Sequence, residues 1–163
     1  MSLQHDWLDD GSLLMLLPKS LLGHWHGCAT DDYDRACKVG DSWLSTLPVD
    51  GGVGILLGGD PGMALLIRDT SETLTLVRWH YADDESELIA FALRREAVAA
   101  TEPDFVFENK FSDWVMYDAA ADPLADRPPT RSFDLPVALI RITTQFVKSD
   151  RNAAIVHTFL LAA

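Results

Sequence analysis

Two short stretches near the N-terminus hold residue types that bind metal ions or act as nucleophiles. His24, His26 and Cys28 offer three metal-ligating side chains within five residues, and Cys37 offers a fourth. Structural zinc sites usually place ligand pairs two to four residues apart on tight turns, whereas here the bulky Trp25 separates the histidines and no second pair follows. The spacing therefore argues against a metal site, and we expect neither a metal nor a cofactor.

Paired carboxylates follow in Asp32-Tyr33-Asp34, a pattern that some transferases use to hold a divalent ion. Such tripeptides are common, and helix capping explains Asp31 or Asp32 directly. The neighbouring Arg35 can pair with one of these carboxylates. The block is therefore better interpreted as part of a recognition surface, with some of its residues serving structure, than as a catalytic centre.

Glycine-rich segments and histidines are the remaining sources of possible chemistry. Residues 51–54 and 58–59 match neither the Walker phosphate-loop pattern nor the dinucleotide-binding fingerprint. No Gly-Lys-Ser/Thr follows them, and the chain continues as a strand rather than a helix. The sequence also lacks a Gly-x-Ser-x-Gly nucleophile elbow. A catalytic group assembled in space from His5, His80 or His157 stays open, because separation in sequence does not report distance in the fold.

Acidic residues are the candidates for binding a partner. They are Asp31, Asp32, Asp34, Asp83, Asp84, Glu85 and Glu87. The chain has a net charge of −12, and residues 69–126 hold fourteen acids against four bases. Such a field repels nucleic acid and anionic lipid and attracts a basic partner. Helix capping or solvation by water is enough to explain each of these carboxylates individually. The partner-binding hypothesis therefore concerns the seven residues together.

Short elements must position these residues. The hydrophobic pattern predicts a buried strand over 13–17, a brief helix over 19–25 after Pro18, and a second helix from Asp31 or Asp32 to a stop at Gly40. Further strands are predicted over 44–49, 53–57, 63–68, 73–81, 105–108, 114–117, 137–148 and 153–161, with a loop over 119–129. A longer helix begins at residues 83–87, and its predicted apolar face is Leu88, Ile89, Phe91, Ala92 and Val98. The elements predict an α+β fold with one mostly antiparallel sheet, one principal helix and short N-terminal helices.

Length and composition predict a single globular domain over residues 1–163. Hydrophobic residues make up 48% of the chain, yet no apolar run reaches the roughly 20 residues of a spanning helix. Asp6, Asp9 and Asp10 stand where a secretory signal carries bases, so we expect a cytoplasmic protein. In that reducing compartment Cys28 and Cys37 are expected as free, buried thiols.

The first half of the chain also carries a series of motifs in a defined order. They are Leu-Leu-Pro at 16–18, Leu-Leu-x-x-Trp at 21–25, Asp-Tyr-Asp-Arg-Ala-Cys at 32–37, Gly-Asp at 40–41, Leu-Leu-Gly-Gly-Asp-Pro at 56–61 and Val-Arg-Trp-x-Tyr-Ala-Asp at 77–83. Taken together they resemble the immunity protein 21 family of bacterial polymorphic-toxin systems. The resemblance implies a cytoplasmic α+β protein that binds a cognate toxin and neutralises it without turnover, and it carries over no catalytic or metal residue.

Three functions follow as hypotheses. An acidic inhibitor suits a cationic toxin, and because many cationic toxins act on nucleic acid, a nuclease-type toxin is the expected partner. A small hydrolase with a histidine and carboxylates would instead gather titratable groups with shifted pKa values in a cleft. A general acidic adaptor would present a flat apolar patch with an acidic rim. The oligomeric state is left open.

Overall fold

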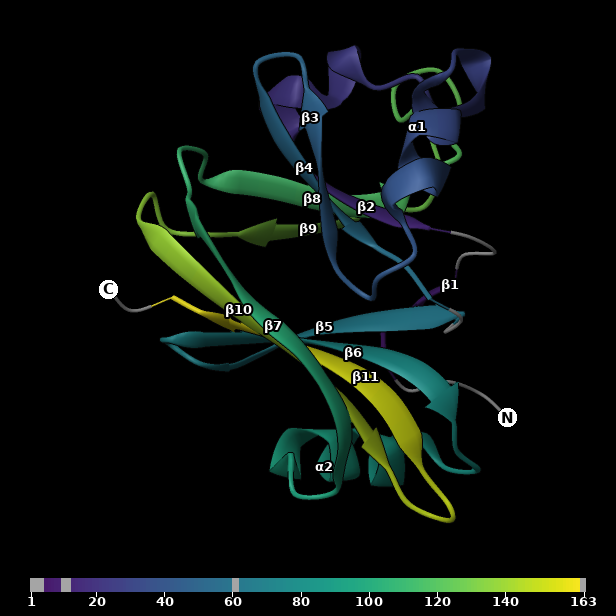
Figure 1. Ribbon diagram of the computed structural model, residues 1–163, viewed down its shortest axis with the longest axis vertical. Helices are drawn as coiled ribbons and strands as arrows, with labels where there is room; N and C mark the ends of the chain where they lie inside the picture. Colours follow the sequence, from purple (N-terminus) through teal and green to yellow (C-terminus); the bar gives the residue numbers. More distant parts are fainter. Residues whose placement is uncertain (1–4, 10–12, 60–61, 162–163) are drawn as a thin grey trace. The chain divides into compact units, whose positions relative to one another are not determined.

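The computed structural model describes residues 5–9, 13–59 and 62–161, and these residues divide into two compact units. Unit 1 contains Met1–Asp9, Pro61–Lys110 and Val137–Ala163, and unit 2 contains Asp10–Asp60 and Phe111–Pro136. Each unit is therefore built from separate segments of the chain. Figure 1 shows the strands and helices of both units along the chain.

Unit 1 is built on a six-stranded antiparallel sheet in the order β1-β5-β6-β11-β10-β7. Its strands are β1 (Leu8–Asp9), β5 (Met63–Thr70), β6 (Thr73–Tyr81), β7 (Val98–Glu108), β10 (Leu139–Lys148) and β11 (Ala153–Leu160). Hairpins join β5 to β6 and β10 to β11, and in the second turn the Ser149 amide donates to the Asn152 carbonyl at 2.7 Å. The long hydrogen-bonded hairpins give β11 a central place, with both of its faces buried.

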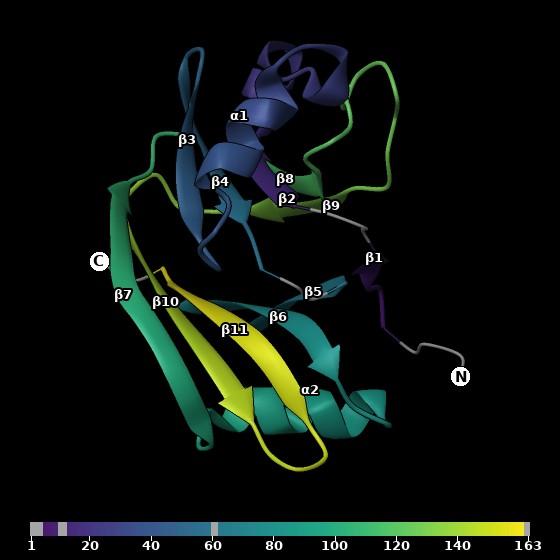
Figure 2. The same ribbon diagram turned by 45° about the vertical axis from the view of Figure 1, so that its right-hand side comes forward.

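Helix α2 (Glu85–Arg94) packs on one face of this sheet (Figure 2). Its Leu88, Phe91 and Ala92 share a core with Val77 of β6 and with residues 147, 154 and 156 of the two C-terminal strands. The Asp84 side chain accepts a hydrogen bond from the Glu87 amide at 2.7 Å, so the helix begins with a side-chain cap. Burying one apolar stripe is what stabilises so short a helix.

Helix α2 ends four residues earlier than its predicted apolar face, so the placement of Val98 on that face is wrong. Arg95 follows the helix with φ of 54°, in the left-handed region that ends helices. A glycine usually occupies such a position, but here the Arg95 guanidinium donates to Thr75 Oγ1 at 2.6 Å and to Thr158 Oγ1 at 3.1 Å. These contacts fix the stop, and Val98 begins β7 instead.

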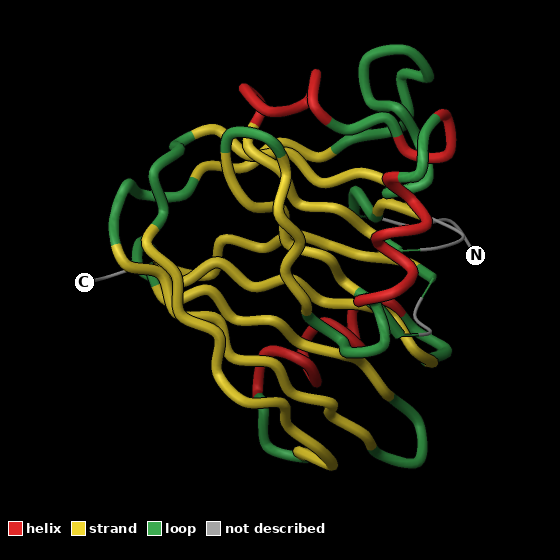
Figure 3. Tube along the Cα trace, turned by 45° about the horizontal axis from the view of Figure 1, so that its top comes forward, coloured by secondary structure: helices red, strands yellow, loops and turns green. Residues whose placement is uncertain are grey.

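Unit 2 is built on a five-stranded antiparallel sheet in the order β3-β4-β2-β8-β9. The strands are β2 (Leu14–Pro18), β3 (Ser45–Val49), β4 (Gly52–Leu57), β8 (Asp113–Asp118) and β9 (Arg131–Asp134). Beside the sheet lie the 3-10 helices η1 (Lys19–His24) and η2 (Gly27–Ala29) and the helix α1 (Asp32–Val39). Figure 3 separates these helices by colour from the strands.

The core of unit 2 gathers Met15 and Leu17 of β2, Trp25, Ala36 of α1 and Tyr117 of β8. Trp25 is fully buried, and its indole N–H donates to the Ala119 carbonyl at 2.9 Å, which satisfies the polar end of the ring. The turn between β3 and β4 uses Gly51 at φ of 92°, a conformation that other residues adopt at a cost. The strands predicted on either side of residues 50–52 therefore pair as a hairpin.

The predicted class, mainly antiparallel sheet with some helix, is confirmed, but its details differ. The strands of the described ranges form two sheets, where one was predicted. A single principal helix is not confirmed, because α1 has eight residues and α2 has ten. Among the described residues, no helix has the length and apolar character to cross a membrane.

Candidate protein-binding surface

Helix α1 holds the first set of predicted partner-binding residues, in unit 2. Asp31 stands at the N-cap position without a side-chain cap hydrogen bond, and both it and Asp34 are exposed. Asp32 is half-buried, and its carboxylate accepts from the His26 amide at 2.9 Å and lies 3.4 Å from the Arg35 guanidinium. The Asp31 and Asp34 side chains are therefore accessible to solvent, while Asp32 holds the segment that precedes the helix.

Helix α2 and the residues before it hold the second set, in unit 1. Asp83 is exposed, and Asp84 is the N-cap of the helix. Glu87 is exposed, accepts from Asn152 Nδ2 at 3.3 Å and lies 3.7 Å from the Arg151 guanidinium. Asp84 therefore caps the helix, and Glu87 contacts the turn between β10 and β11. Asp83 is the exposed carboxylate of this set that takes part in neither contact.

Glu85 does not belong on a binding surface, because it is only 4% exposed. Its carboxylate accepts hydrogen bonds from the His5 amide at 2.8 Å and from the Trp7 indole at 3.1 Å, and it contacts His5 Nδ1. A buried carboxylate needs such donors, since leaving it unpaired costs several kcal/mol, roughly 3–5 for a broken pair. Glu85 thus attaches the N-terminal segment to α2.

A histidine and a carboxylate far apart in sequence meet in unit 2. His26 Nδ1 lies 2.9 Å from Asp122 Oδ2, and the Asp122 carboxylate also accepts from the amides of Leu124 and Ala125 at 3.1 and 3.0 Å. The hydrogen bond from His26, followed by that from Ala125, lowers the pKa of Asp122 below its usual value. Nothing in the sequence indicates this pair, because 96 residues separate its members.

Behind this pair, the Tyr117 side chain is fully buried, and its hydroxyl has no hydrogen-bond partner among the described residues. Burial, and then the charges of Asp122 and Asp32, raise the pKa of Tyr117. The phenol therefore stays protonated and cannot serve as a general base at neutral pH. The His26–Asp122 pair joins the η2 segment to the loop over 119–126, which is a structural role.

The histidines considered for a hydrolase have different surroundings. His5 contacts Glu85, and His80 packs edge-on against Phe146 with ring centroids 5.5 Å apart. His157 is fully buried, and its Nδ1 lies 2.9 Å from Thr144 Oγ1. Of these three histidines only His157 contacts a hydroxyl, and both His157 and Thr144 are buried away from any substrate, which counts against the hydrolase hypothesis. No group of three or more His, Cys, Asp or Glu suited to a metal ion occurs in the described ranges.

The two cysteines are free thiols as predicted, but the prediction that they are buried is wrong, because both are exposed. Helix α1 buries only Ala36 in the core of unit 2. Cys37 is the next residue along the helix and so points about 100° away from that stripe. Cys28 lies in η2, whose buried residue is Gly27.

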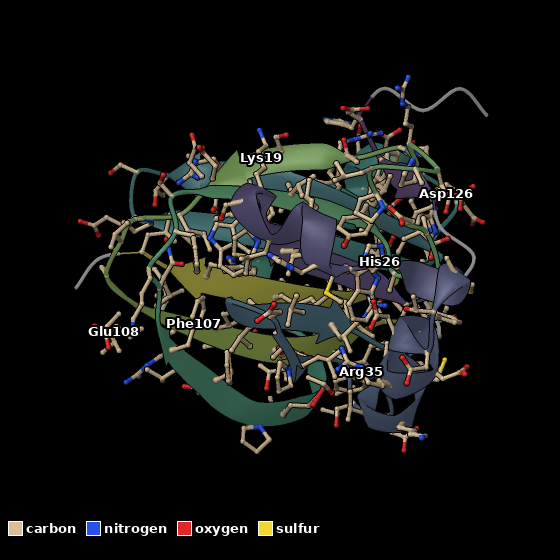
Figure 4. All side chains as sticks on the ribbon, turned by 90° about the horizontal axis from the view of Figure 1, so that it is seen from above. Lys19, His26, Arg35, Phe107, Glu108 and Asp126 are labelled. Carbon is tan, nitrogen blue, oxygen red and sulfur yellow. The ribbon has the colours of Figure 1, made fainter. Side chains whose placement is uncertain are left out.

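Strand β7 adds exposed carboxylates that the sequence did not indicate. The predicted strand covered only 105–108, whereas β7 spans Val98–Glu108. Asp104 and Glu108 are exposed on it, and Figure 4 labels Glu108 with its side chain directed away from the ribbon. The polar segment around Pro103 hides the strand from a propensity-based prediction, because these residues are depleted in strands.

Comparison with known proteins supports the resemblance seen in the motifs. The family model described as immunity protein 21 matches residues 6–153. No curated protein and no solved structure matches the chain. The family match covers strands, helices and exposed carboxylates of both units, well beyond the motifs in the first half. Because the match spans most of the sequence, the chain belongs to the immunity protein 21 family.

Proposed function

We propose that this chain is a non-catalytic immunity protein that binds a cognate bacterial toxin in the cytoplasm and neutralises it without turnover. The observation that supports this most strongly is the family match over residues 6–153. An inhibitor of this kind needs a surface of stable shape and charge rather than a reacting group. Exposed carboxylates on two well-packed units meet that need.

The expected toxin is basic, and we propose a nuclease-type toxin because enzymes that act on nucleic acid carry positive surfaces. The chain has 25 acidic and 13 basic residues, and acids exceed bases in each unit. Opposite charges on two proteins raise the rate of encounter, and the effect weakens as salt screens them. Binding to the toxin should therefore slow markedly as ionic strength rises.

Asp31, Asp34 and Asp83 are the proposed contact residues with the least structural use, because each is exposed and their carboxylates are not needed for a cap. Asp32, Asp84 and Glu87 are proposed as contributors whose substitution also affects local structure. Glu85 is left out because it is buried. Substitution of these three exposed residues therefore tests binding with the least effect on local structure.

The test pairs this protein with the product of the gene next to its own, where the proposal expects the toxin to be encoded. Co-expression should restore growth, and the two proteins should co-purify. The variant Asp31→Lys/Asp34→Lys/Asp83→Lys should associate about tenfold more slowly at low salt. The matched control Asp41→Lys/Glu72→Lys/Asp113→Lys changes net charge equally, at exposed sites in the same two units, and should keep most of the rate.

Each result decides a different part of the proposal. Absence of both growth rescue and co-purification would refute the immunity function. Rescue with equal association rates for the two triple variants would refute the proposed contact residues. An association rate that ignores ionic strength would refute the basic toxin.

A further inference from the structure

Strand β7 occupies the end of the six-stranded sheet and pairs, among the described strands, only with β10. With eleven residues it is a long edge strand, and such edges offer backbone donors and acceptors to a further strand. Proteins usually protect them with prolines, bulges and charges. The two halves of β7 differ in this protection.

The N-terminal half of β7 is interrupted. The register with β10 shifts between Ile142 and Thr144, where Pro103 and Asp104 stand opposite the single residue Thr143, and shifts again near its start. Pro103 also lacks an amide hydrogen. A bulge with a proline is a poor template for another strand.

The C-terminal half of β7 is regular. Residues 105–108 pair in unbroken register with 142–139, and the Asn109 amide donates to the Ala138 carbonyl at 2.8 Å. In an antiparallel pair, every second residue directs its backbone groups toward the partner strand. Residues 105, 107 and 109 therefore face β10, and the amide and carbonyl of Val106 and Glu108 face the outer edge.

Side chains around this edge include three exposed apolar residues, with Arg141 between them and acidic neighbours. Val106 pairs with Arg141 and Arg141 with Leu160, so the three share one face of the sheet. Leu139 lies two residues before Arg141 on the same face, and Leu139, Val106 and Leu160 are 59%, 45% and 38% exposed. Helix α2 covers the other end of this face, where Val156 packs against Leu88.

The charge of the edge selects among possible occupants. Asp104 and Glu108 flank Val106 and are exposed, and Arg141 lies 3.9 Å from Asp104. An antiparallel pair of two β7 strands centred on Val106 would set these acids opposite each other, which is unfavourable. An extended segment whose side chains on this face are basic, aliphatic and basic, at every second residue, would set its cations opposite the acids and its aliphatic side chain opposite Val106.

We infer that the edge of β7 at Asp104–Glu108 binds an extended basic segment of the toxin by strand addition. This rests on the proposed function for the identity of the partner. Backbone hydrogen bonds to Val106 and Glu108 would hold the segment, and its aliphatic side chain would pack against Val106. The acids exclude strands of like charge.

A first experiment needs no toxin. The probes are a peptide of repeating Lys-Thr-Val-Thr, whose Lys and Val side chains share one face, the same peptide with Glu in place of Lys, and the Lys peptide N-methylated at every residue. Amide hydrogen exchange with water can be followed by NMR on the full chain. The exchange rates of the Val106 and Glu108 amides should fall about tenfold when the first peptide reaches nine-tenths saturation, and the other two peptides should leave these rates unchanged. Equal effects of the N-methylated or acidic peptide, or no slowing at millimolar peptide, overturn the inference.

A second experiment uses the adjacent gene product. Asp104→Lys/Glu108→Lys should weaken binding at least about tenfold, whereas the charge-matched control Glu72→Lys/Asp150→Lys should stay within about twofold. Tight toxin binding that is equal in both variants overturns strand addition and leaves the immunity function standing. If the toxin does not bind while the first peptide still slows amide exchange at Val106 and Glu108, the immunity function alone is refuted. A wild-type dimer that the Asp104→Lys/Glu108→Lys variant dissociates would assign the edge to a second copy and overturn the inference.

Discussion

Replacing His157 by Gln should remove a pH dependence of stability that the buried imidazole causes. His157 lies on the central strand β11, is fully buried, and its Nε2 has no hydrogen-bond partner among the described residues. Burial, and then the charge of the buried Arg78, lower the pKa of His157 well below 6.5. Thr144 Oγ1 contacts the other ring nitrogen at 2.9 Å. The native ring therefore stays neutral in mild acid.

The sign of the effect follows from proton binding. Below pH 6.5 the unfolded chain takes up a proton at His157 that the native protein does not, so acid favours unfolding. The free energy of unfolding should fall by about 1.4 kcal/mol for each pH unit below that value. The loss continues at this rate for as long as the native imidazole stays neutral. The contribution of His157 to the free energy of unfolding is therefore largest above pH 6.5 and is lost as the pH falls.

Urea unfolding followed by tryptophan fluorescence and circular dichroism measures this loss at several pH values. His157→Gln keeps an amide that can contact Thr144 but removes the titrating group, so its stability should fall less than that of the wild type. The exposed His80→Gln variant is the control and should follow the wild type. If the curves of the wild type and His157→Gln stay parallel from about pH 7.5 to 4.5, the imidazole is protonated in the native protein and the reasoning is wrong.

Three further predictions follow from the packing. Glu85→Ala should lower the free energy of unfolding in urea by about 1–3 kcal/mol, because it removes the acceptor of the hydrogen bonds from the His5 amide and the Trp7 indole. The exposed Glu96→Ala should change it by less than about 0.5 kcal/mol. Cys28 and Cys37 should both react with a thiol reagent in the native protein, and a titre below two thiols per chain would contradict their exposure. The units should unfold together, because the chain passes between them repeatedly and neither is a continuous segment; two separate transitions by fluorescence and circular dichroism would contradict the single-domain prediction.

Local patterns predicted many elements well. The strands predicted on either side of residues 50–52 and of residues 149–152 pair across those turns, and the helix predicted from residues 83–87 begins with acids in its first turn. These features depend on neighbours in sequence: glycine permits the turn, and carboxylates favour the amino end of a helix. The early helix after Pro18 was also expected, although it is a 3-10 helix.

The predictions from sequence are wrong where contacts with residues distant along the chain determine the structure. Arg95 ends α2 through threonines on β6 and β11, and β7 extends through Pro103 because β10 pairs with it. Burial of Glu85 depends on Trp7 and His5, nearly eighty residues away in the chain. No periodicity within a short window records such contacts.

By itself, the sequence determined the acidic charge, the antiparallel strand-rich class and, through the order of its motifs, the immunity protein 21 family. Only the tertiary structure decided the division into two sheets, the burial of Glu85 and the exposure of both cysteines and of the β7 edge. The physical reason is that charge and local propensity belong to residues and short segments, whereas burial and strand order depend on which distant segments pair.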